Sequence, residues 1–130
     1  MEKGGHRSTL AEPTLTGTGP FSVPDVCVID VIGPLSGGRR VHGFRDLTQG
    51  LLDRGARNLA INLAAVPYAD SHGVGSLVAA FNLARQAGAG IKFFAASERL
   101  VQALNRLHLN AVFEVYKDEA SAVASFRRDT

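Results

Sequence analysis

The feature that most constrains the fold is a regular alternation of two hydrophobic patterns. Short runs rich in β-branched and apolar residues, at 25–33, 58–66, 91–96 and 112–116, predict strands. Apolar residues at three- and four-residue spacing predict helices that begin near residues 41, 74, 98 and 119. Strands alternating with helices favour an α/β domain with helices packed on a parallel sheet. We therefore predict a single α/β domain with about four to five mostly parallel strands and four helices.

The first twenty residues lack this periodicity. They are rich in Gly, Thr, Ser and Pro, and they end in a Gly-Thr-Gly-Pro run at residues 17–20. We predict a flexible N-terminal tail over residues 1–20, with a short edge strand inside it as the second possibility. The remaining chain, residues 21–130, is long enough for one domain with its own core.

Composition excludes several classes of protein. Hydrophobic residues make up 45% and charged residues 20%, as in ordinary soluble globular proteins. The net charge is +2 and the basic residues are scattered, so we expect no direct binding to nucleic acid. No apolar run approaches the roughly 20 residues of a membrane helix, and the N-terminus has no secretory signal. We expect a cytoplasmic protein whose single cysteine, Cys27, is buried within an apolar run.

Residues 67–75, called the elbow below, join the second predicted strand to the second predicted helix. The elbow places Asp70, Ser71 and His72 side by side, followed by Gly73, Val74 and Gly75. Asp70 or Ser71 is predicted to cap the helix by accepting hydrogen bonds from its first amides, which stabilises by about 0.5–2 kcal/mol. The glycines leave the backbone open, so that a partner can approach it closely.

Catalysis is a poor explanation of the elbow. Asp, Ser and His are the residue types of a hydrolase triad, but three consecutive residues cannot take up its geometry. Ser71 also lacks the glycine two positions earlier that marks a nucleophile elbow. We expect no catalytic residue and no enzymatic activity.

A nucleotide or a metal explains the elbow no better. Its Gly73-Val74-Gly75 run lacks the third glycine of a dinucleotide fingerprint, because Val78 occupies that position. The four histidines show no spacing typical of metal ligands. We expect no cofactor and no metal.

The Ser71 hydroxyl is a suitable site for a phosphate switch. A phosphate adds about −1.5 to −2 charges, which the positive end of a helix stabilises by about 0.3–1 kcal/mol. Inside a protein contact, the same dianion beside Asp70 would cost several kcal/mol. Only about 2.8 kcal/mol weakens a complex 100-fold. One phosphate on Ser71 would therefore release a partner without unfolding the domain.

The elbow and its flanking segments resemble the STAS domains of anti-sigma factor antagonists. That family usually has an apolar strand, then Asp-Ser-Ser/Thr-Gly-Leu-Gly, then an amphipathic helix, as in residues 59–63 and 68–75 here. The Gly-Ala-Gly run at 88–90 before the third strand and the Leu-His-Leu run at 107–109 before the fourth are also similar. The resemblance covers about residues 23–127.

The resemblance implies a function as well as a fold. It implies a partner, an anti-sigma factor that is a serine kinase with a histidine-kinase-like ATPase fold. The unphosphorylated antagonist binds that kinase and frees a sigma factor, and phosphorylation of the serine after the Asp, here Ser71, switches it off. ATP and magnesium would belong to the kinase. The residues implied to contact the partner are Asp70, Ser71, His72, Gly73, Val74 and Gly75.

Two positions depart from the family pattern. His72 stands where a Ser or Thr is usual, and Ser36 stands where the family often has an Asp near the phosphorylated serine. An imidazole beside Ser71 would alter kinase access or make partner affinity depend on pH. The alternative function is therefore a STAS interaction module without a phosphorylation cycle, such as a stress scaffold, a subunit of a lipid-transport complex or a small-ligand sensor.

Overall fold

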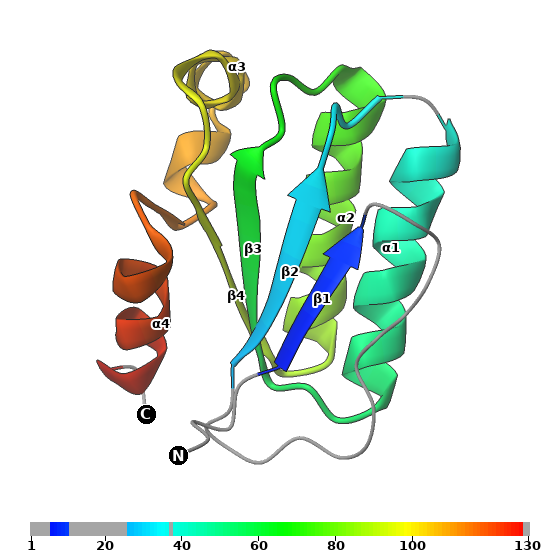
Figure 1. The fold of residues 1–130 in the computed structure, drawn as a ribbon, viewed down its shortest axis with the longest axis vertical. Helices are drawn as coiled ribbons and strands as arrows, with labels where there is room; N and C mark the ends of the chain where they lie inside the picture. The colour runs from blue at the N-terminus through cyan, green and yellow to red at the C-terminus, as the bar shows by residue number, and fades with distance from the viewer. Residues whose placement is uncertain (1–5, 11–25, 37, 129–130) are drawn as a thin grey trace.

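The structure is a computed structural model that describes residues 6–10, 26–36 and 38–128 (Figure 1). Its centre is a five-stranded sheet in which the strands follow one another in chain order and all pair in parallel. The strands are β1 (His6–Leu10), β2 (Cys27–Ile32), β3 (Asn58–Ala65), β4 (Gly90–Phe94) and β5 (Val115–Tyr116). The α/β class and the parallel sheet are confirmed.

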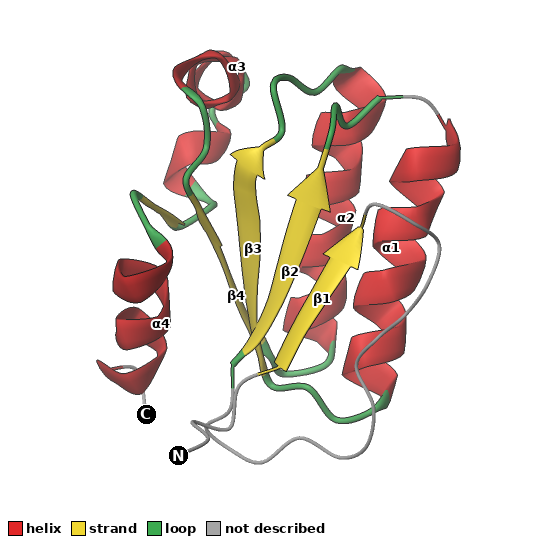
Figure 2. Ribbon diagram, viewed as in Figure 1, coloured by secondary structure: helices red, strands yellow, loops and turns green. Residues whose placement is uncertain are grey.

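Helices cover both faces of the sheet (Figure 2). Helices α1 (Gly38–Asp53) and α2 (Ser71–Gln86) lie behind it, and α4 (Glu119–Arg128) lies on the other face. Helix α3 (Glu98–Arg106) and the short 3-10 helix η1 (Leu109–Ala111) connect β4 to β5. Because α3 lies at the end to which the strands point, it is at the same end of the molecule as the start of α2.

Two hydrophobic clusters divide the core according to the pleat of the strands. The larger cluster, which includes Ile29, Phe44 and Leu77, lies between the sheet and helices α1 and α2. The smaller cluster includes Val28 and Phe126 and lies under α4. Ile29 and its neighbour Val28 point to opposite faces, as alternate strand residues do. Strand β3 is buried on both faces over its first four apolar residues, as predicted for a central strand.

A lysine ties α4 to the sheet. Lys92, in the middle of β4, is 4% exposed. Its Nζ donates to Ser125 Oγ at 2.8 Å, lies 3.3 Å from Glu114 Oε1, and stands 4.7 Å from the centre of the Phe126 ring. Each buried proton of the ammonium group needs an acceptor, and these contacts provide one on α4. Sequence patterns offered no signal for this role.

The N-terminal segment contains the edge strand that was the second possibility for residues 1–20. Strand β1 pairs with β2 in a register that starts at His6 and Cys27. Residues 1–5 and 11–25 lie outside the described part of the chain, so the flexibility predicted for residues 1–5 and 11–20 and the domain boundary at residue 20 stay predictions.

The strand predicted at 112–116 is wrong in its first half. His108 has a left-handed backbone with φ of 60°, and η1 follows it. The Leu109 carbonyl accepts from Val112 N and Phe113 N, both at 2.9 Å. Since those amides are used locally, they cannot pair with β4, and only Val115–Tyr116 forms β5.

Other local predictions are confirmed. Ser97 Oγ accepts from Leu100 N at 3.1 Å and caps α3, and Asp118 Oδ1 accepts from Ser121 N at 2.8 Å and caps α4. The hydrogen bonds from Ser121 hold the pKa of the Asp118 carboxyl below its ordinary value. Cys27 is buried, and this burial raises the pKa of its thiol to about 11.

Candidate functional site

The elbow is held in place by the loop that follows β2. Leu35 and Ala69 form an isolated parallel bridge, in which Leu35 N donates to Tyr68 O and Asp70 N donates to Leu35 O, both at 3.1 Å. The Leu35 side chain is fully buried. Ser36 comes next in the chain, so the loop at 33–36 lies beside the elbow, as the resemblance implied. The backbone before α2 therefore has one fixed path.

Asp70 is the residue that caps α2. Its Oδ1 accepts from Gly73 N at 2.8 Å, and its backbone carbonyl accepts from Val74 N at 2.9 Å. Of the two capping candidates, the structure selects Asp70. Its carboxylate also lies at the positive end of the helix dipole, where a negative charge is favourable. This side chain already binds one of the free amides that a ligand at this helix end would need.

The two glycines of the elbow have different roles. A β-carbon on Gly73 would overlap the backbone carbonyl oxygen of Leu35, so no larger residue fits there. A β-carbon on Gly75 would meet nothing within 4 Å. Gly73 therefore serves the packing of the domain, and of the two glycines only Gly75 borders open space.

Side chains of the elbow differ in their access to solvent. Asp70, Ser71, His72 and Gly75 are exposed, whereas Gly73 is buried and Val74 is 6% exposed. Val74 packs into the larger core cluster. The predicted contact residues thus divide into an accessible group, which a partner can touch, and a buried pair that orients the helix.

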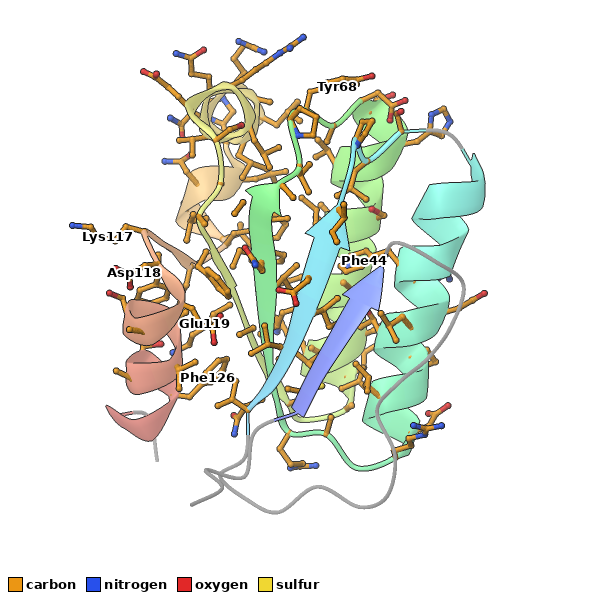
Figure 3. All side chains as sticks on the ribbon, viewed as in Figure 1. Phe44, Tyr68, Lys117, Asp118, Glu119 and Phe126 are labelled. Carbon is orange, nitrogen blue, oxygen red and sulfur yellow. The ribbon has the colours of Figure 1, made fainter. Side chains whose placement is uncertain are left out.

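The exposed surface of the elbow continues onto α3. Tyr68 is 38% exposed, and the guanidinium carbon of Arg99 lies 5.1 Å from the centre of its ring. Figure 3 shows Tyr68 at the end of the molecule that carries α3. A small cleft of about 180 Å³ lies between the elbow and α3, and its lining includes Tyr68, Arg99, Ala103 and Arg106. Sequence reasoning missed these arginines, although their seven-residue spacing places them on one helix face.

A model of the STAS domain matches residues 22–122, which is most of the chain. The chain belongs to the STAS-domain family. Domains of this family are generally interaction modules rather than enzymes. No curated protein has a matching sequence.

Solved structures share the STAS fold. A candidate anti-sigma factor antagonist from Thermotoga maritima superposes with a TM-score of 0.75 at 20% identity, covering 82% of this chain and 91% of its own. A sulfate transporter family protein from Wolinella succinogenes gives 0.64 at 23% identity, with 79% and 85% covered. The anti-sigma factor antagonist SpoIIAA in its unphosphorylated form gives 0.57 at 16% identity, with 78% and 87% covered. At these identities the likeness shows the fold alone.

The described part of this STAS domain has neither a cluster of metal-ligating residues nor a helix that could span a membrane. No group of three or more His, Cys, Asp or Glu residues there is placed to hold a metal ion. No helix among the described residues combines the length and hydrophobicity that a membrane crossing requires. The Asp70 carboxylate accepts from Gly73 N and so serves the helix as its cap.

Proposed function

We propose that this STAS domain is an anti-sigma factor antagonist that regulates transcription indirectly. It binds a serine-kinase anti-sigma factor of the histidine-kinase-like ATPase type, and phosphorylation of Ser71 releases it. The observation that carries the proposal is the exposed Ser71 at the first position of α2, on a backbone held by Leu35 and Asp70. Two of the similar structures, the Thermotoga protein and SpoIIAA, are described as antagonists of anti-sigma factors, which supports it.

The unphosphorylated surface would bind the partner. Tyr68, Asp70, Ser71 and His72 are exposed on the elbow, and the fixed path of the backbone reduces the entropy that ordering it would cost. The kinase would bring ATP and magnesium, and this chain would supply only the hydroxyl. Both proteins would meet in the cytoplasm.

The phosphorylated surface would reject the same partner. A phosphate on Ser71 would lie next to the Asp70 carboxylate, which already accepts from Gly73 N. The favourable dipole effect of about 0.3–1 kcal/mol is smaller than the several kcal/mol needed to desolvate a dianion beside a carboxylate. A net penalty of about 2.8 kcal/mol would be enough to weaken the complex 100-fold.

The proposal is tested by incubating the chain with ATP, magnesium and each candidate kinase from the same genome. Mass spectrometry should locate one phosphate on Ser71, and Ser71→Ala should remove it. Ser121→Ala, which changes another serine in the first turn of a helix, is the matched control and should keep the phosphate. The phosphorylated chain should bind the kinase about 100-fold more weakly. If Ser71 stays unlabelled with every kinase and Ser71→Asp binds as wild type does, the switch is ruled out.

A STAS interaction module without a phosphorylation cycle is the second candidate. Two observations favour it: His72 replaces the usual second hydroxyl, and Ser36, beside the elbow, replaces an acidic residue. In that case Ser71→Asp leaves partner binding unchanged, whereas loss of the exposed elbow side chains still weakens it.

A further inference from the structure

A second site lies at the carboxyl ends of β4 and β5, apart from the elbow. A cleft of about 510 Å³ opens there, lined by Ala95 and Ala96 after β4 and by Lys117 after β5. The volume falls within the range of about 300–1,000 Å³ that is usual for small-molecule pockets.

Helix α3 separates this cleft from the elbow. Val101, Leu104 and Asn105 face the cleft, whereas Arg99 and Arg106 face Tyr68. The larger cleft and the small cleft beside Tyr68 therefore lie on different sides of α3, and no residue lines both.

One wall of the cleft is apolar and firmly packed. Leu104 and Phe113 are 2% and 4% exposed, and the Phe113 ring lies 4.8 Å from the ring of Phe93 and 5.5 Å from that of Phe81. Val115, which also lines the cleft, is 38% exposed. The wall therefore offers a packed apolar surface with an exposed apolar side chain at its edge.

The backbone around the cleft is strained. The two non-glycine residues with positive φ in the described part of the chain are Ala95, at 62°, and His108, at 60°. Ala95 lines the cleft, and His108 turns the chain from α3 into η1, which contributes Asn110 to the lining. A left-handed backbone is costly for residues with a β-carbon, and such strain gathers at binding sites. Here the 2.9 Å hydrogen bond from Ala95 N to Tyr116 O helps to maintain it.

The polar groups of the cleft favour an anion. Lys117 is the charged residue of the lining, and the amides of Asn105 and Asn110 add hydrogen-bond donors. No described residue that lines the cleft is acidic. The nearest carboxylates in sequence do not line the cleft, and both have partners. Asp118 accepts from Ser121 N, and Glu114 accepts from the hydroxyl of Tyr116, a lining residue, and lies 3.3 Å from Lys92 Nζ.

We propose that this cleft binds a small amphipathic carboxylate. The apolar body of the ligand would lie against Val101, Leu104 and Phe113, and its carboxylate would meet Lys117 at the rim. A cationic ligand of the same shape would bind more weakly, because Lys117 would repel it and no lining residue is acidic. Since this site shares no residue with the elbow, the proposal does not depend on the phosphorylation of Ser71.

Phenylbutyrate is the probe for the test. It is titrated into the isotope-labelled full chain, and the amide shifts are followed by NMR. Saturable shifts should map to residues 95–96, 105 and 117, with a Kd of about 1 mM or tighter for a ligand of this size. Phenylbutanamide, the neutral analogue, should bind more weakly by up to about fivefold, and phenylbutylamine should bind more weakly still.

Two variants separate charge from shape. Lys117→Met keeps most of the stem of this exposed side chain, and it should weaken phenylbutyrate about fivefold and remove the preference over the amide. Ala96→Phe should fill the cleft and abolish binding. Arg54→Met removes an exposed cation in the turn after α1, and it should change nothing. The proposal is overturned if wild type binds acid and amide equally, if Lys117→Met binds as wild type does, if the shifts map elsewhere, or if no probe gives saturable shifts.

Discussion

The carbonyl oxygen of Leu35 occupies the space that a side chain at residue 73 would need, so Gly73 and Leu35 together set the path of the elbow. Leu35 also bonds through its backbone to Tyr68 and Asp70. The loop after β2 therefore positions the residues that precede α2 and, with them, Ser71 at its first position, the proposed phosphate acceptor.

The first prediction concerns these two glycines. Gly73→Ala forces the elbow away from Leu35 and should lower the free energy of unfolding by about 1–3 kcal/mol. Gly75→Ala, two residues later in the same helix and in open space, should raise it by about 0.4–1 kcal/mol. Urea denaturation of both variants measures the difference. Equal effects would show that the close approach of Leu35 to Gly73 is not decisive.

The second prediction concerns the cap of α2. Asp70→Ala removes the acceptor for Gly73 N and should cost about 0.5–2 kcal/mol in the free energy of unfolding. Asp70→Asn keeps an acceptor oxygen and should retain most of that stability, which makes it the matched control. Thermal and urea unfolding test this directly. An Asn variant as unstable as the Ala variant would mean that charge, rather than the hydrogen bond, stabilises the elbow.

The third prediction concerns Cys27, whose burial raises its pKa from an ordinary value of 9.0 to about 11. A raised pKa means that the folded state favours the neutral thiol. The neutral, buried thiol therefore contributes its whole stabilisation below pH 9.0, and that stabilisation is lost as the pH rises towards about 11. Wild type should lose more stability over this range than Cys27→Ala does. A thiol reagent should label Cys27 only when the protein unfolds, and rapid labelling of the native protein would contradict its burial.

The fourth prediction concerns acid stability at the start of α4. Hydrogen bonds from Ser121 lower the pKa of Asp118, so the ionised carboxylate stabilises the folded state above the unfolded pKa of about 3.9. That stabilisation is lost as pH falls through the lower, folded pKa. Asp118→Asn should thus be less stable than wild type near neutral pH and equal to it in strong acid. If the difference in melting temperature between wild type and Asp118→Asn is the same in acid as at neutral pH, ionisation of Asp118 does not stabilise the folded state.

Local sequence patterns were sufficient for features that depend on neighbouring residues. The caps at Ser97 and Asp118 need only a side-chain oxygen three residues before a free amide, and both were predicted. Burial of Cys27 follows from its apolar run. The strand and helix alternation is likewise a matter of local periodicity, and it predicted the α/β class.

Contacts between distant segments decided the rest. The role of Gly73 depends on Leu35, which lies in another loop, and β1 becomes visible as a strand only through its pairing with β2. The late start of the fourth predicted strand depends on His108, whose left-handed backbone no hydrophobic pattern reports. The cleft beside α3 arises because β4, β5 and η1 meet at one edge of the sheet. Periodicity records which residues are buried along an element, but it carries no information on which other element buries them.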